Sequence, residues 1–150
     1  MNERYETFTL LISRISRSIR RLQHQEMADY GLRSAHIACL HALYLQDGLT
    51  AAELCERCEE DKATISRALV RLEDEGYITG ESTGAKRYKT PLYLTEKGRA
   101  VSGKISERIN RVLDEVSTAL SEEERIAFYH SLTLICDQLD LASKRRETPS

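Results

Sequence analysis

The sequence has few of the residues that interrupt helices, with 2 prolines and 7 glycines among 150 residues. This scarcity favours long helices over a sandwich of many short strands. No stretch approaches about 18 uninterrupted apolar residues, so no transmembrane helix is expected. The first residues also lack the basic start and apolar run of a secretory signal, and we therefore expect a cytoplasmic protein. In that compartment Cys39, Cys55, Cys58 and Cys136 are expected to be reduced thiols rather than disulfides.

The charges of the chain are unevenly distributed, although the net charge is only −2. Residues 62–72 contain three cations and no acid, and residues 82–94 contain three more, again with no acid. A nearly neutral protein with two basic islands can bind a polyanion through those islands.

Apolar periodicity and helix-capping residues predict six helices. They cover, in order, residues 3–28, 34–46, 51–58, 62–75, 96–118 and 122–146. Between the fourth and fifth helices, residues 77–79 and 88–94 are β-prone and are joined by a loop over residues 82–87. Pro91 restricts the second β-prone segment to the edge of a sheet.

Five polar residues stand where a helix N-terminus needs a side-chain acceptor. The expected capping residues are Ser34, Thr50, Asp61, Thr95 and Ser121. Thr50 and Ser121 are each followed three residues later by a glutamate, which completes a capping box. In the second helix, Ile37, Leu40 and Tyr44 are expected to face the core.

The predicted order is a short helix, a tight turn, an amphipathic helix and a basic hairpin, which is the layout of a winged helix-turn-helix. The fold class expected is therefore mainly α with a small β-hairpin wing, a winged helix-turn-helix flanked by long helices. The second helix of such a motif enters the major groove, where short or basic side chains reach base edges and phosphates. The candidate DNA-binding residues are Lys62, Ala63, Thr64, Ser66, Arg67 and Arg71 on the helix and Lys86, Arg87 and Lys89 on the wing.

Three segments of the sequence together resemble the MarR family of bacterial transcription regulators. They are residues 53–58 (ELCERC), 62–78 (KATISRALVRLEDEGYI) and 92–98 (LYLTEKG). The resemblance implies a homodimer, with a DNA-binding lobe over residues 32–99 and dimerisation helices over residues 1–31 and 100–146. It also implies a pseudo-palindromic DNA operator, and a repressor that a small ligand or an oxidant releases from that operator. The alternatives are a winged-helix protein–protein interaction module that does not bind DNA, and a thiol-based redox-sensing regulator.

The sequence departs from the family pattern in the wing and in the turn. Lys86 and Tyr88 stand where many members have an aspartate and a second arginine, so only Arg87 of that wing motif is present. Glu59 and Glu60 occupy a turn that often begins with glycine. A left-handed conformation at Glu59 would cost roughly 1 kcal/mol, and two acids near DNA phosphates oppose binding.

Cys55 and Cys58 form a C-x-x-C pair, which is typical of metal sites and redox thiols as well as of helix cores. Aligned on the family pattern, both cysteines take core positions of the third helix, and this is the interpretation we favour, with no metal expected. His24, Tyr30, His41 and Tyr44 lie near the junction of the first two helices, where ligands of the family bind, although packed core is the more frequent role of such residues. No phosphate loop, His-Glu-x-x-His or nucleophile elbow is present, so we expect no enzyme, no catalytic residues and no cofactor.

Overall fold

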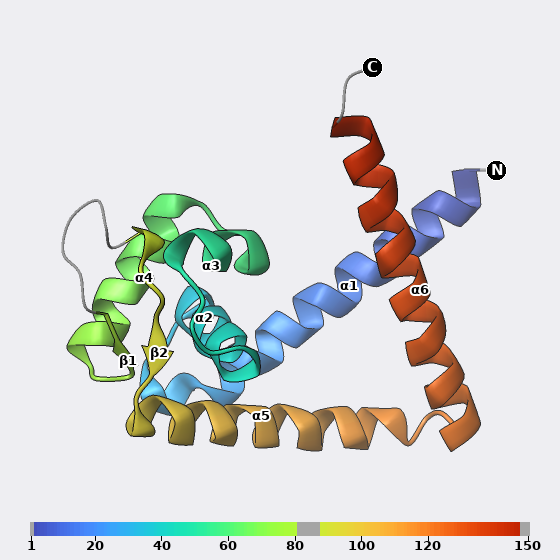
Figure 1. Ribbon diagram of the computed structural model, residues 1–150. Coiled ribbons are helices and arrows are strands. Elements are labelled where there is room, and N and C mark those ends of the chain that lie inside the picture. Colours follow the sequence, from blue (N-terminus) through green and yellow to red (C-terminus); the bar gives the residue numbers. More distant parts are fainter. Residues whose placement is uncertain (1, 81–87, 148–150) are drawn as a thin grey trace. The chain divides into compact units, whose positions relative to one another are not determined.

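The computed structural model describes residues 2–80 and 88–147, and within these ranges it is almost entirely helical (Figure 1). The helices are α1 (Asn2–Glu26), the 3-10 turn η1 (Ala28–Tyr30), α2 (Ser34–Leu45), α3 (Ala51–Cys58), α4 (Lys62–Asp74), α5 (Glu96–Ser117) and α6 (Glu122–Glu147). The strands β1 (Ile78–Thr79) and β2 (Tyr93–Leu94) form one antiparallel pair. The predicted fold class is confirmed, and most helix boundaries fall within two residues of those expected. Two compact units divide the chain, residues 1–110 and residues 111–150.

The core of the first unit is built around α2, which α3, α4 and the strand pair surround in one lobe (Figure 1). Helix α2 is apolar on more than one face and buries Ile37, Cys39, Leu40 and Leu43. A helix with this distribution is stable only when neighbours cover it on several sides. Helix α4 adds one apolar stripe to this core, consisting of Ile65, Ala68, Leu69 and Leu72.

Four of the five predicted helix caps form as expected. Thr50 Oγ1 and Asp61 Oδ1 accept hydrogen bonds from the backbone N–H groups of Glu53 and Thr64 at 3.2 and 2.7 Å. The remaining two caps are Thr95 Oγ1 with Gly98 N at 3.0 Å and Ser121 Oγ with Glu124 N at 3.2 Å. These caps fix the first turns of α3, α4, α5 and α6.

The predictions for α2 need two corrections. Ser34 is the first helical residue and not the cap, because Arg33 takes the N-cap position and donates its backbone N–H to His36 Nδ1 at 3.0 Å. Tyr44 is 37% exposed, and Leu43 and Cys39 fill the core next to it. A tyrosine keeps its hydroxyl near the surface more readily than the aliphatic side chains do.

The buried imidazole of His36 makes the stability of this lobe sensitive to acid. Burial first, and then the positive charge of Arg71, lower the pKa of His36 below its ordinary value of 6.5. The unfolded chain therefore binds more protons than the folded chain below that pH, so stability is complete above about pH 6.5 and is lost as the pH falls towards the folded-state pKa. We expect His36→Gln to flatten this loss, measured as urea midpoints at several pH values between about 7.5 and 5. A variant as acid-sensitive as the wild type would contradict this role.

The second β-prone segment is shorter than predicted. Only Tyr93 and Leu94 pair as a strand, with Thr79 and Ile78 of β1. Leu92 instead forms an isolated bridge with Leu49, at the turn before α3, and donates its N–H to the Leu49 carbonyl at 2.9 Å. Pro91 has no backbone N–H that could donate a hydrogen bond to a neighbouring strand, so β2 cannot extend towards the N-terminus through Pro91.

The start of α5 lies unusually close to the segment that joins α4 to β1. A Cβ atom at Gly98 would be 1.9 Å from the carbonyl oxygen of Tyr77. Thr95 reinforces this contact, because its hydroxyl donates to the Gly76 carbonyl at 2.6 Å and its N–H to the Tyr77 carbonyl at 3.0 Å. Gly98 therefore provides the space that lets α5 pack against the strand pair.

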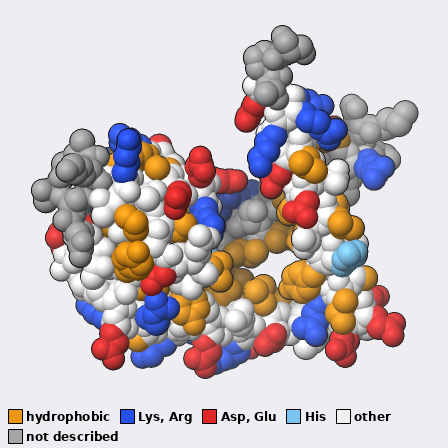
Figure 2. All heavy atoms as spheres, viewed as in Figure 1, with side chains coloured by type: hydrophobic (Ala, Val, Ile, Leu, Met, Phe, Trp, Pro, Cys, Tyr) orange, Lys and Arg blue, Asp and Glu red, His pale blue; other side chains and the backbone are white. Residues whose placement is uncertain are grey.

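The second unit consists of the end of α5 and the whole of α6, and no side chain of α6 is buried. Hydrophobic side chains lie along the surface of this helix (Figure 2). Phe128, Ile135 and Leu139 are exposed on one face of α6, and Leu134 and Leu141 are exposed on the other side. None of the helices in the described ranges combines the length and apolar character needed to cross a membrane.

Candidate nucleic-acid interface

The N-terminal half of α4 presents a polar and basic face to solvent. Lys62, Ala63, Ser66 and Arg67 are exposed, and Thr64 is half-buried beside them. The opposite face of the same turns is buried in the core, so the orientation of the helix is fixed. Val70 extends the outward face by one turn and is 44% exposed.

The turn that leads into α4 has a strained backbone. Glu59 has φ 52° and ψ 39°, and it is the one non-glycine residue with a positive φ in the part of the chain that the structure describes. Glu59 therefore carries the conformational cost of roughly 1 kcal/mol of a left-handed non-glycine residue. The turn places Asp61 at the N-terminus of α4, where the hydrogen bond from Thr64 N–H lowers the pKa of the Asp61 carboxyl.

Tyr88 connects the wing to the helix-turn-helix. Its ring lies 4.4 Å from Lys62 Nζ in a cation–π contact, and its hydroxyl lies 3.5 Å from Cys55 Sγ. Tyr88, which stands where many MarR-like sequences have a second wing arginine, thus packs against the first residue of α4 and against α3. Sequence reasoning did not find this role, since the three residues are far apart in the chain.

The other predicted DNA-contacting residues differ from one another in their surroundings. Lys86 and Arg87 lie outside the described residues, and Lys89 is exposed. Arg71 is half-buried and has intramolecular partners, because its side chain donates to Glu75 Oε1 at 3.0 Å and to the Gly31 carbonyl at 2.9 Å. Arg71 thus anchors α4 to the connection between α1 and α2, while its side chain stays 40% exposed and a DNA contact there stays a prediction.

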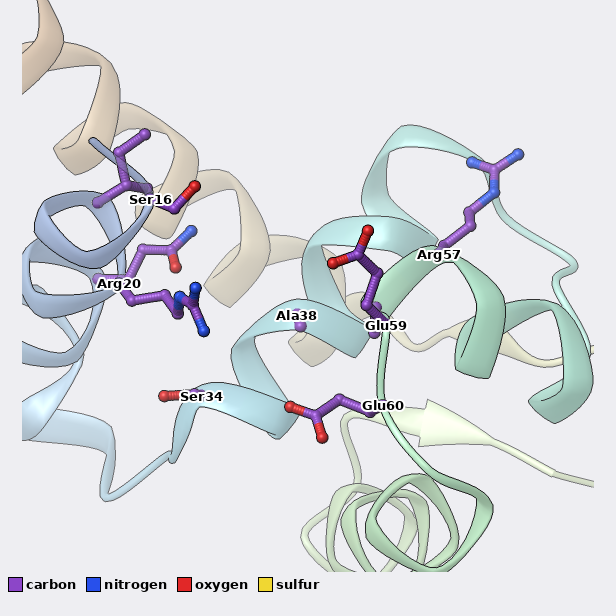
Figure 3. Close-up of a pocket in the computed structure, with 10 residues that line it drawn as sticks. Ser16, Arg20, Ser34, Ala38, Arg57, Glu59 and Glu60 are labelled. Atoms are coloured by element: carbon purple, nitrogen blue, oxygen red, sulfur yellow. The ribbon is translucent and has the colours of Figure 1, made fainter. Parts of the chain in front are cut away.

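A cavity of about 360 Å³ lies within the first unit, between α1, the N-terminal half of α2 and the end of α3 (Figure 3). Arg20 extends into it from α1, and Glu59 and Glu60 from the strained turn. Arg57 turns away, towards Gln46, whose side-chain oxygen accepts its hydrogen bond. The other lining residues are Ser16, Ile19, Gln23, Ser34, Ala38 and Cys58.

The cysteines of α2 and α3 lie close together. Cys39 is buried, whereas Cys55 and Cys58, expected in the core, are half-buried at its edge. The interaction with Cys58 raises the pKa of the Cys39 thiol, and the interaction with Cys39 lowers the pKa of the Cys58 thiol. Among the described residues, no group of three or more histidines, cysteines or acids is arranged to hold a metal ion.

The four ligand-binding candidates do not line this cavity. His24, His41 and Tyr44 are exposed, and Tyr30 is half-buried. The ring of Tyr30 lies 5.7 Å from the guanidinium of Arg108 on α5, and Arg108 also donates to the Glu26 carbonyl at 2.6 Å. Arg108 was not a sequence candidate, because a single arginine on a long helix carries no signal.

A capped helix-turn-helix, a short strand pair and long flanking helices define the class of winged helix-turn-helix regulators that bind DNA. Residues 30–87 match the MarR family. The chain is 26% identical over 124 residues to the HTH-type transcriptional regulator TtmR of Methylorubrum extorquens (strain PA1), covering 83% of this chain but only 63% of that protein. The crystal structure of a MarR family regulator from Silicibacter pomeroyi superposes with a TM-score of 0.72 and 29% identity, over 83% of this chain and 84% of that one.

A further solved structure is the MarR family protein Rv2887 of Mycobacterium tuberculosis in complex with p-aminosalicylic acid. Its TM-score is 0.70 at 23% identity, over 85% of this chain and 96% of that one. The chain is similar to the MarR family of transcription regulators in sequence and in fold.

Proposed function

We propose that this regulator is a homodimeric repressor that binds a pseudo-palindromic operator through α4 and is released by a small effector. The observation that carries the proposal is the exposed face of α4, on which Lys62, Ser66 and Arg67 surround the capped first turns. A helix oriented in this way can enter the major groove with its N-terminal residues at the base edges.

The side chains on this face suit different parts of a duplex. Arg67 lies on the second turn of α4, where its planar guanidinium can bind guanine O6 and N7 together. Lys62 at the helix start, and Lys86, Arg87 and Lys89 of the wing, suit phosphates or the minor groove. Glu59 and Glu60 disfavour phosphate contacts at the turn, so the proposal assigns affinity mainly to α4 and the wing.

The dimer is proposed from apolar side chains that the single chain leaves exposed. On α1 these include Phe8, Leu11 and Ile15, and on α6 they include Ile135 and Leu139. Exposed apolar surface on this scale is typical of an interaction site. A twofold dimer would present two copies of α4 to half-sites about one helical turn, roughly 10 bp, apart.

The effector is proposed to bind near the junction of α1 and α2. Tyr30 and Arg108 support this, because an aromatic ring beside a guanidinium suits a small aromatic acid. The complex of the relative from M. tuberculosis with p-aminosalicylic acid is consistent with a ligand of that class. His24, His41 and Tyr44 remain candidate contacts at the same junction.

Substitutions at Arg67 and Arg87 test the DNA-binding proposal. A duplex selected by the wild-type protein from a random pool serves as operator, and a scrambled duplex as non-specific DNA. Arg67→Ala is expected to weaken operator binding by about 1–3 kcal/mol per half-site and to leave scrambled DNA nearly unaffected. Arg87→Ala is expected to weaken both duplexes and to reduce the salt slope by about one unit per contact.

Two control variants separate charge from base recognition in these titrations. Arg67→Lys keeps the charge but loses the planar fork, so it should behave like Arg67→Ala on the operator. Arg145→Ala removes an exposed cation near the end of α6 and should change neither duplex. If Arg67→Ala loses the same factor on both duplexes, Arg67 does not contact bases. If no variant changes binding, the protein–protein interaction module becomes the better proposal.

A further inference from the structure

Tyr88 lies at the place where the wing returns to the lobe. Its side chain is half-buried and packs against the core. The hydroxyl lies 3.5 Å from Cys55 Sγ of α3, and the centroid of the ring lies 4.4 Å from Lys62 Nζ of α4. Packing and the contact with α3 therefore fix the ring, and the ring in turn holds the ammonium of the first residue of α4.

Lys62 is a cation at a place where the helix itself disfavours one. It is exposed and begins α4, where the positive end of the helix macrodipole lies. The acid next to it in the sequence, Asp61, is engaged as the cap, since its carboxylate accepts a hydrogen bond from Thr64 N–H at 2.7 Å. The Tyr88 ring supplies an attraction that offsets the unfavourable end of the helix.

An aromatic ring holds a lysine without neutralising it. The face of the ring attracts the ammonium through its quadrupole and brings no opposite charge. The contact with Cys55, and then burial, raise the pKa of Tyr88, so the ring is an uncharged phenol at neutral pH. Lys62 thus keeps its positive charge, and its N–H donors can serve another acceptor. This combination of order and full charge suits a phosphate contact.

A second lysine is held over a ring at the same distance but has a different role. Lys97 Nζ lies 4.4 Å from the centroid of the Tyr77 ring, and it also donates to the Glu75 carbonyl at 2.6 Å. Lys97 therefore joins the start of α5 to the end of α4. Lys62 differs because it lies on the exposed face of α4.

We propose that Tyr88 is a positioning residue for DNA binding, whose ring holds the Lys62 ammonium in place for a phosphate of the duplex. A free lysine loses rotamer freedom when it binds DNA, whereas a lysine held by a ring has lost part of that freedom on folding. Tyr88 thus contributes through a neighbouring cation and not by a charge of its own. The inference rests on the proposed function, because it takes α4 as the DNA-binding helix.

The test titrates variants of the full-length chain with the selected operator and the scrambled duplex at several salt concentrations. Tyr88→Leu removes the ring and should weaken both duplexes by about 2- to 5-fold per half-site, which corresponds to an exposed cation–π contact. It should keep the wild-type salt slope, because Lys62 still reaches the phosphate. Lys62→Ala should reduce that slope by about one unit per contact. Tyr88→Phe keeps the ring and should bind like the wild type.

A double variant separates positioning from a structural role. If Tyr88 acts through Lys62, adding Tyr88→Leu to Lys62→Ala should cause no further loss of affinity. A loss of the same factor in both backgrounds would overturn the proposal, since the ring would then act on the fold of the wing. Lys97→Ala is the matched control and should change neither duplex. Equal losses for the two lysine variants would show a general effect of charge and would also overturn it.

A series of similar shape at this position keeps the proposal testable if Tyr88→Leu fails to fold. Increasing fluorination of the ring in Tyr88→Phe weakens the attraction of its face for a cation. Affinity for both duplexes should fall with each added fluorine when Lys62 is present and stay constant with Lys62→Ala. Constant affinity in both backgrounds would contradict a role of the ring face.

Nuclear magnetic resonance of the free protein separates the contact from its role in DNA binding. The ring current of Tyr88 should shift the Lys62 ε-protons upfield, and Tyr88→Leu should abolish this shift. Absence of the shift in the wild type would overturn the inference alone. A wild type that shows the shift but binds neither duplex would overturn the proposed function, and the positioning role with it.

Discussion

Leu132→Asp is expected to convert the protein from a dimer to a monomer at micromolar concentration. Leu132 lies at the middle of the apolar face of α6, between Phe128, Ile135 and Leu139, which the chain alone leaves exposed. If a second copy covers this face, two unpaired carboxylates per dimer must be desolvated. Each of them costs several kcal/mol, so the dimer dissociation constant should rise by about 100-fold or more. Sedimentation velocity measures the effect, and far-UV circular dichroism establishes that α6 remains helical.

Gln138→Asp is the matched control for this substitution. It adds the same charge to the same helix at an exposed position on the other side, and it should leave the dimer intact. If both variants dissociate the protein, general charge repulsion along α6 is the cause, and the apolar face is not the interface. If neither does, the proposed dimer through α6 is wrong.

Gly98→Ala is expected to destabilise the protein strongly. A Cβ at this position would stand 1.9 Å from the Tyr77 carbonyl oxygen, which is backbone and cannot rotate away. Relief requires α5 to move off the strand pair, and overpacking on this scale costs about 3 kcal/mol or more. For a chain of this size the thermal midpoint should fall by roughly 6–12 °C.

Gly103→Ala provides the comparison on the same helix. The nearest atom to a Cβ there is the Tyr44 hydroxyl oxygen at 3.6 Å, an ordinary contact. Because alanine favours a helix over glycine by up to about 1 kcal/mol, this variant should equal or exceed the wild type in stability. Equal thermal midpoints for the two variants would show that the close approach at Gly98 is not a constraint.

The features that local chemistry dictates were predictable from the sequence. Thr50, Asp61 and Thr95 each carry an oxygen where a helix start requires an acceptor, and each caps the expected helix. The apolar stripe of α4, centred on Ile65 and Leu69, follows from helical periodicity alone. The outward face of α4 then follows as the complement of that stripe.

The features that depend on contacts between distant segments were not predictable. Arg33 caps α2 through His36, and Tyr88 packs against Lys62 and Cys55, yet neither arrangement has a periodic signal. The cavity lies where α1, α2 and the end of α3 approach one another, so no single segment marks it. For the same reason, the sequence did not indicate the partners of Arg71, which are Glu75 and the Gly31 carbonyl.

The hydrogen bond from Arg71 to the Gly31 carbonyl joins α4, the helix proposed to read DNA, to the connection between α1 and α2. An effector that displaces this connection must also disturb α4, and DNA that fixes α4 must restrain the connection. Thermodynamic linkage makes the two effects equal, so the factor by which an effector weakens operator binding is the factor by which the operator weakens effector binding. A promoter occupied by this protein would then resist induction until the effector concentration rises above that which saturates the free regulator.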